Sequence, residues 1–136
     1  MMDKKFEQIF PIGEKNEAYS DYFVGQSYLK KLSTEGINII NVTFEPGCRN
    51  NWHIHHNSRQ ILLVTAGKGY YQEWGKNPKE LNPGDVINIP PEVKHWHGAA
   101  PSSWFSHIAI EVPDNNDVSK NEFLEVVNQA DYEKLK

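Results

Sequence analysis

The sequence predicts a small all-β fold, a barrel or sandwich of short strands with a helical tail at the C-terminal end. Its 136 residues suit a single domain, because domains commonly contain about 100–150 residues. Turn signals recur at residues 45–47, 75–78 and 82–85, which leaves too little room between them for long helices. The stretches between these turns are short and rich in β-branched and aromatic side chains, a composition typical of strands.

Five stretches in the middle of the chain are expected to form strands. The first covers residues 37–44, in which isoleucine, valine, threonine and phenylalanine dominate. The other four cover residues 60–65, 69–74, 86–89 and 104–112. Five or more strands at this spacing favour an antiparallel sandwich or barrel over a helical or mixed fold.

The two ends of the chain carry less regular patterns. Residues 1–25 mix polar and aromatic side chains without a clear period, and we expect irregular chain with one edge strand there. Residues 114–120 are polar and predict a loop. Residues 121–127 and 128–135 each begin with asparagine, a common N-cap, and continue with side chains that tolerate a helix. We therefore expect helix in both of these segments.

Composition argues against several classes of function. The net charge is −4 and no long cluster of lysine or arginine occurs, so the chain lacks the electrostatic signature of nucleic-acid or anionic-membrane binding. No apolar run approaches the roughly 20 residues of a membrane span. The single cysteine, Cys48, cannot form an intramolecular disulfide, which agrees with a cytoplasmic location. We interpret Cys48 as a free, unreactive thiol.

The six histidines are the strongest indication of chemistry, because all of them fall between residues 53 and 107. A His-x-His pair on a strand directs two imidazoles to one face, where they can bind a single transition-metal ion. His53 and His55 form such a pair, and Gln60 on the next strand can add an amide oxygen. A barrel could return His95 to the same place. His56 would lie on the opposite face and is expected to be exposed to solvent.

These spacings resemble the two motifs of the cupin family. The first motif is matched position by position by Gly47, His53, His55, Gln60 and Gly67, with Gln60 where the commoner form carries glutamate. The second is matched by Gly84, Pro90 and His95, with Glu92 and Ala99 in place of the usual glycine and asparagine. Residues 95–110 are similar to a narrower group, the small single-domain cupins that include manganese-dependent hydroxynitrile lyases and cupins related to carboxymuconolactone decarboxylases.

The resemblance implies a jelly-roll (double-stranded β-helix) cupin barrel that forms one domain over residues 1–136. Its motif-bearing core would cover about residues 37–113, with an N-terminal edge segment at 1–36 and a C-terminal tail at 114–136. It implies one divalent transition metal, manganese in the lyase group, with iron, nickel, cobalt or zinc also compatible. The implied metal ligands are His53, His55, Gln60 and His95.

The resemblance also implies a pocket around this metal. His97 and His107 correspond to pocket histidines of the lyase group, His107 to the base, and His107 could instead be a structural imidazole. Ile40 and Val42, two residues apart, would line one wall. Glu111 shares a strand face with His107, where the lyases carry glutamine, and a carboxylate there could itself be the base. The four tryptophans are expected to pack in the core and at its rim.

Three functions follow from this interpretation, from different classes. The first is a metal-dependent lyase that cleaves a small hydroxy compound such as a cyanohydrin. The second is a metal-dependent dioxygenase or related oxidoreductase, and the third is a non-catalytic cupin that binds a small molecule. The partner in each case is a small molecule. We also expect a homodimer, in which residues 19–25 add to the sheet of a second copy.

Overall fold

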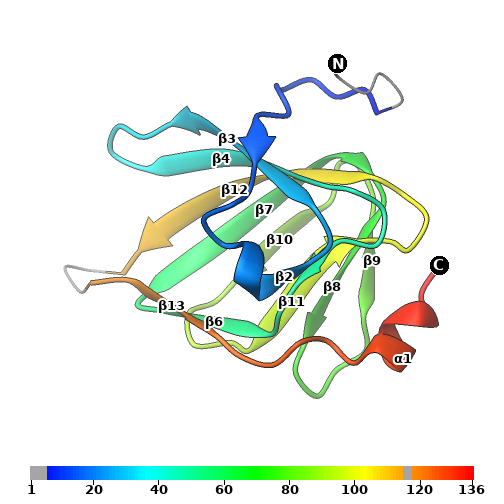
Figure 1. Ribbon diagram of the computed structural model, residues 1–136. Coiled ribbons are helices and arrows are strands. Elements are labelled where there is room, and N and C mark those ends of the chain that lie inside the picture. Colours follow the sequence, from blue (N-terminus) through cyan, green and yellow to red (C-terminus); the bar gives the residue numbers. More distant parts are fainter. Residues whose placement is uncertain (1–5, 115–117) are drawn as a thin grey trace.

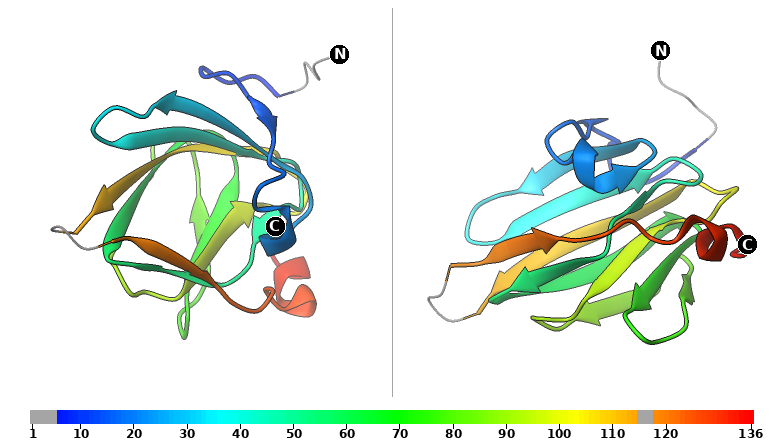
Figure 2. Two further views of the ribbon diagram at one scale, coloured as in Figure 1. Left: turned by 60° about the vertical axis from the view of Figure 1, so that its left-hand side comes forward. Right: turned by 60° about the horizontal axis from the view of Figure 1, so that its bottom comes forward.

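The computed structural model describes residues 6–114 and 118–136, which fold into two antiparallel β-sheets that face each other (Figures 1 and 2). The smaller, six-stranded sheet has the order β1–β3–β4–β12–β7–β10. Its strands are β1 (Glu14–Lys15), β3 (Ser27–Ser33), β4 (Asn38–Phe44), β12 (Phe105–Pro113), β7 (Ser58–Gly67) and β10 (Val86–Ile89). The all-β jelly-roll class predicted from the sequence is confirmed.

The seven-stranded sheet has the order β13–β6–β11–β5–β2, with β8 on the other edge of β11 and β9 beyond it. Its strands are β13 (Lys120–Phe123), β6 (His53–His56), β11 (His95–Ala99), β5 (Arg49–Asn50), β2 (Phe23–Val24), β8 (Gly69–Glu73) and β9 (Lys79–Leu81). Strands β5 and β11 approach closely at Gly98, where an added Cβ would come within 2.5 Å of Arg49. This close approach requires glycine.

All five expected central strands are present, as β4, β7, β8, β10 and β12. The N-terminal region is more regular than expected, because β3 pairs along β4 over most of its length. Part of the segment expected to add to a second copy instead forms a 3-10 helix, η1 (Ser20–Tyr22), and the short strand β2, which pairs with β5 of the same chain. The expected edge strand is confirmed twice over, because β1 and β2 lie at the edges of the two sheets.

The helix predicted over residues 121–127 is wrong, because residues 120–123 form strand β13. The free edge of β6 offers backbone hydrogen-bond partners, and β13 pairs with it from Lys120 to Phe123. The second predicted helix is confirmed as α1 (Gln129–Glu133), whose N-cap side chain, Asn128, accepts a hydrogen bond from the Asp131 amide at 3.0 Å. The expected loop at 114–120 ends where β13 begins, and residues 115–117 lie outside the described residues.

The space between the sheets is apolar over much of its volume. Phe44, Leu62, Val64, Leu81 and Phe105 are among its most buried side chains. A second apolar cluster lies on the outer face of the seven-stranded sheet, where the C-terminal segment and α1 cover it (Figure 2). Within the described residues, no helix is long and apolar enough to cross a membrane.

Candidate metal centre

The interior contains a group of imidazoles supplied by β6 and β11. Alternation along β6 directs His53 and His55 inward, and both are buried. Strand β11 pairs His95 directly with His53, and the ring centroids of these two residues are 4.2 Å apart. The ring of His55 lies 5.1 Å from that of His53 and 5.3 Å from that of His95. Three of the predicted ligands therefore meet in one place.

Each of these three histidines is oriented by a hydrogen bond at the same ring nitrogen. The Nδ1 atoms of His53 and His95 lie 2.8 and 2.9 Å from the carbonyl oxygens of Asn51 and Val93. Nδ1 of His55 lies 2.6 Å from Oδ1 of Asn121 on β13. A carbonyl oxygen can only accept, so Nδ1 carries the proton in each ring and Nε2 keeps its lone pair.

Several lone-pair atoms that could ligate a metal are buried without partners, as expected of a metal site. Nε2 of His55, Nε2 of His95 and Oε1 of Gln60 are buried and make no hydrogen bond to residues 6–114 or 118–136. Polar atoms left in this state are costly unless something binds them. Three neutral imidazoles and an amide oxygen suit a divalent transition metal, and the orienting carbonyls are the usual outer shell of such histidine ligands.

Burial keeps these imidazoles neutral. Loss of solvation, together with the neighbouring rings, holds the pKa of His53 well below 6.5, and burial lowers the pKa of His95 to about 4. Burial also lowers the pKa of His55. Because a metal competes with protons for the same lone pairs, the site stays available for a cation throughout the neutral pH range.

His97 is a fourth histidine at the centre. His53, His95 and His97 each offer a ring nitrogen, and these nitrogens lie within 4.8 Å of one another. The side-chain oxygen Oδ1 of Asn50 accepts a hydrogen bond from the backbone N–H of His97 at 2.9 Å. This orientation turns Nδ2 of Asn50 toward Nε2 of the His97 ring, 3.2 Å away. Nε2 therefore accepts a hydrogen bond, and the proton is on Nδ1, which has no partner. This arrangement suits a hydrogen-bonding role better than ligation.

A pocket of about 370 Å³ opens beside the centre. Its lining includes His53, His55, Gln60, His97 and Glu111. Glu111 lies opposite Gln60 in the β12–β7 register, and Ser58 Oγ donates to its Oε2 at 3.4 Å. A carboxylate thus lies on the wall beside the predicted ligands. Ile40 also lines the pocket, whereas Val42 lies deeper, 8% exposed in the apolar core.

His107 lies behind the pocket wall. The residue has no exposed surface, and its ring packs against both Phe44 and Phe105, 4.9 Å from the ring of His97. Neither ring nitrogen has a hydrogen-bond partner, and burial lowers the pKa of His107 to about 3. His107 is therefore a neutral imidazole that reaches the pocket only through His97.

Other residues identified in the sequence lie away from this centre. His56 points outward, as expected, and its Nε2 lies 2.8 Å from Glu122. Burial raises the pKa of the Cys48 thiol to about 12, so the thiol stays protonated. The orienting residues Asn50 and Asn121 were not identified from the sequence. No local pattern could have indicated Asn121, which is 66 positions from its partner.

Comparison with known proteins places this geometry in context. A family described as "Cupin domain" matches residues 40–106. The chain is 44% identical over 91 residues to a (R)-mandelonitrile lyase of Granulicella tundricola, an alignment that covers 67% of each protein. A shorter alignment of 46 residues is 33% identical to an acireductone dioxygenase of Bacillus pumilus and covers 31% of this chain and 26% of that enzyme.

Solved structures agree with the fold assignment. A cupin-like protein from Thermotoga maritima superposes with a TM-score of 0.83 at 42% sequence identity, over 95% of this chain and 97% of that one. A predicted oxalate decarboxylase from the same organism has a TM-score of 0.62 at 16% identity, covering 67% and 84% of the two chains. The second likeness concerns the fold alone.

Proposed function

Because the chain belongs to the cupin domain family, we propose that it is a metal-dependent lyase that cleaves a small hydroxy compound such as a cyanohydrin. The observation that carries the proposal is the set of buried, unpartnered donor atoms on His55, His95 and Gln60 beside a 370 Å³ pocket. The 44% identity to a (R)-mandelonitrile lyase supports the reaction class.

The proposed ligands are His53, His55, Gln60 and His95, and the proposed metal is manganese. A divalent cation held by neutral donors keeps its full charge, and when bound it would lower the pKa of a substrate hydroxyl group. The protein's own part is to hold four donors in fixed orientation. Hydrogen bonds at each Nδ1 do this for the three imidazoles.

We assign proton transfer to His97 and His107 acting as a pair. His97 lines the pocket and can meet the substrate, whereas His107 contacts the ring of His97 from behind. Burial keeps both imidazoles neutral, since it lowers the pKa of each. The Nε2 lone pair of His97 accepts from Asn50, so His97 would take a substrate proton only by giving up that contact, whereas both ring nitrogens of His107 lack hydrogen bonds within the described residues. Glu111 is the competing base, because its carboxylate also lines the pocket.

The pocket wall favours a compact, partly apolar substrate. Ile40 and Leu29 of the six-stranded sheet and Phe23 of β2 contribute aliphatic and aromatic surface to the lining. A small aryl or alkyl group would pack against them while the reacting hydroxyl faces the histidines. We also propose that the protein is a homodimer.

The test is cyanide release from mandelonitrile by protein loaded with manganese, compared with iron-, nickel- and zinc-loaded samples. Release that requires both the metal and His55 supports the lyase. A dioxygenase is the second candidate, favoured by the alignment with an acireductone dioxygenase. Oxygen consumption without cyanide release would favour it, and a pocket that binds small molecules without turnover would indicate a non-catalytic cupin.

A further inference from the structure

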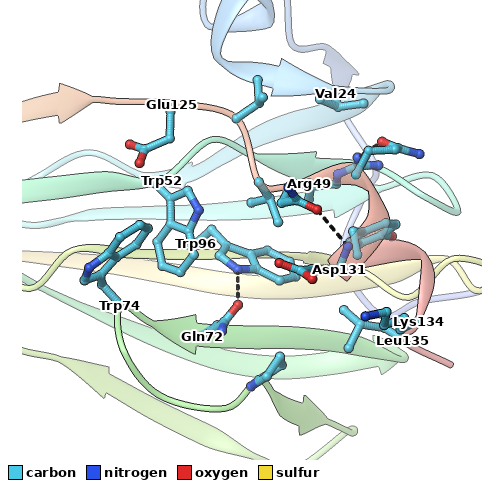
Figure 3. Close-up of a pocket in the computed structure, with 16 residues that line it drawn as sticks. Val24, Arg49, Trp52, Gln72, Trp74, Trp96, Glu125, Asp131, Lys134 and Leu135 are labelled. Carbon is cyan, nitrogen blue, oxygen red and sulfur yellow. Dashed lines mark hydrogen bonds between the residues drawn. The ribbon is translucent and has the colours of Figure 1, made fainter.

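A second, larger cavity lies on the outer face of the seven-stranded sheet, under the C-terminal segment. Its volume is about 770 Å³, within the range of small-molecule pockets. Three indole rings form much of its wall: Trp52 and Trp96 are buried, and Trp74 is 56% exposed (Figure 3). Trp52 and Trp96 pack against Val127 and Tyr132 in the outer apolar cluster, so Trp74 is the indole that offers open surface to a planar ligand.

The opposite end of this cavity holds a buried cation. Arg49 is 4% exposed, and its guanidinium carbon lies 3.9 Å from the centre of the Tyr132 ring. The guanidinium donates to the carbonyl of Gly47 and to the amide oxygen of Gln129, while Nε is buried without a partner. Among the described residues, no carboxylate forms an ion pair with Arg49. A buried charge without a counter-ion is unfavourable.

The other charges around the cavity leave this positive charge unbalanced. Glu125 lines the cavity but pairs with Lys94 at 2.9 Å. Lys94 Nζ also lies 3.5 Å from the centre of the Trp74 ring, so the chain's own cation already occupies one face of that indole. Asp131 and Lys134, both exposed, carry opposite charges at the edge. These contacts disfavour a cationic ligand and favour an anion.

We propose that this cavity binds a small aromatic carboxylate, with its ring against the exposed indole of Trp74 and its carboxylate on the Arg49 guanidinium. A neutral amide oxygen, that of Gln129, now occupies the position of a counter-ion. Gln129 begins α1 and is exposed, and its Nε2 donates to Glu133 at 2.8 Å. Its side chain can turn away from Arg49 while it keeps this second contact, which leaves room for a charged acceptor that binds a guanidinium more strongly. The proposal does not depend on the metal centre.

The primary test compares benzoate with benzamide, a neutral molecule of similar shape, by calorimetry and by NMR of the indole N–H groups. Benzoate is expected to bind more tightly and to shift the signal of Trp74. Arg49→Gln should weaken benzoate binding about 10- to 100-fold, the usual effect of losing a charged hydrogen bond. Lys76→Gln removes the same charge outside the cavity and should change nothing. His55→Ala should also bind benzoate normally, which separates this site from the metal.

Two exposed positions keep the test decisive if Arg49→Gln fails to fold. Trp74→Ala should weaken benzoate binding, because it removes one aromatic wall. Gln129→Ala should strengthen it, because it removes the competing amide oxygen. The proposal is overturned if benzoate and benzamide bind equally, if neither binds at millimolar concentration, or if both substitutions leave benzoate affinity unchanged.

Discussion

The two faces of the seven-stranded sheet carry different chemistry on the same strands. In β11, His95 and His97 face the interior while Trp96 between them faces outward. Just before β6, Trp52 contributes to the outer cavity and the adjacent His53 to the inner pocket. Strand alternation alone accounts for this separation. The inner face therefore presents neutral donors without partners, and the outer face presents indoles with one unbalanced cation.

Loss of an inner ligand should have the largest effect. His55→Ala should lower metal affinity by more than about 100-fold, because removing outer-shell partners alone costs 10- to 100-fold, and any metal-dependent turnover should disappear with it. Metal content after dialysis measures the change. His56→Ala, one residue along but on the outer face, is the matched control and should keep its metal. Equal metal loss in both variants would contradict the assignment of faces.

Substitution of the deeper histidine should reduce turnover without loss of metal. His107→Ala is expected to lower the turnover number about 10²–10⁴-fold, the usual contribution of proton transfer by a positioned group. If His97 and His107 act as a pair, the double variant should be little worse than either single one. Turnover and metal content are measured on the same samples. A mild His107→Ala together with a severe Glu111→Gln would transfer the role to the carboxylate.

An orienting residue should have an intermediate effect. Asn121→Ala removes the acceptor that holds Nδ1 of His55, and metal affinity should fall about 10- to 100-fold. Competition with a chelator of known affinity measures it. Asn88→Ala, an exposed asparagine on β10, serves as the control and should leave affinity unchanged. Unchanged affinity in Asn121→Ala would mean that the hydrogen bond does not orient the ligand.

Two histidines, His107 in the interior and His56 on the outside, should respond to pH with opposite sign. His107 has a pKa of about 3 against 6.5 when unfolded, so below pH 6.5 the unfolded chain binds a proton that the folded chain does not. His107 alone should lower stability on acidification by up to about 1.4 kcal/mol per pH unit, and His107→Leu should remove that part of the slope. His56 behaves oppositely: Glu122 and Glu92 raise its pKa, so its contribution is present in acid and lost as pH rises. Urea unfolding of metal-free protein between pH 5 and 8 measures both.

A substitution on the outer face should change stability and leave the metal centre unaffected. Trp96 Nε1 donates to Oε1 of Gln72 at 2.8 Å (dashed in Figure 3), and the indole is 1% exposed. Gln72→Ala should cost about 1–3 kcal/mol of stability, because it leaves a buried donor without a partner. Metal affinity should not change. A parallel loss of metal in Gln72→Ala would show that the two faces are coupled.

Local patterns predicted much of this molecule. The run at 86–89 coincides with β10, and Asn128 caps a helix as its spacing indicated. The helix over 121–127 could not be rejected in this way, because the partner of β13 is β6, more than 60 residues earlier. Pairing across that distance decided the conformation, and local side-chain preference did not.

The sequence likewise predicted some residues of the candidate site and not others. Motif spacing identified His53, His55 and His95, which the fold brings together. Spacing could not identify what orients them, since Asn121 reaches His55 from a distant strand. Nor could it indicate that His107 lies behind His97, because strand alternation gives the face of a side chain and not its depth. Spacing could not indicate the surroundings of Arg49 either, because its partner Gln129 is 80 positions away.

The alternation of imidazole and indole along β11 also limits where residues can be inserted into or deleted from the chain. An insertion or deletion of one residue within β11 would exchange the faces, bringing Trp96 inward and the histidines outward. Both sites would be lost in one step. Register here is held mainly by β8, which pairs with β11 from His95 to Ala99, whereas β6 pairs with it only at His95. Length variation should therefore be tolerated in the turn at residues 75–78 and excluded from β8 and β11.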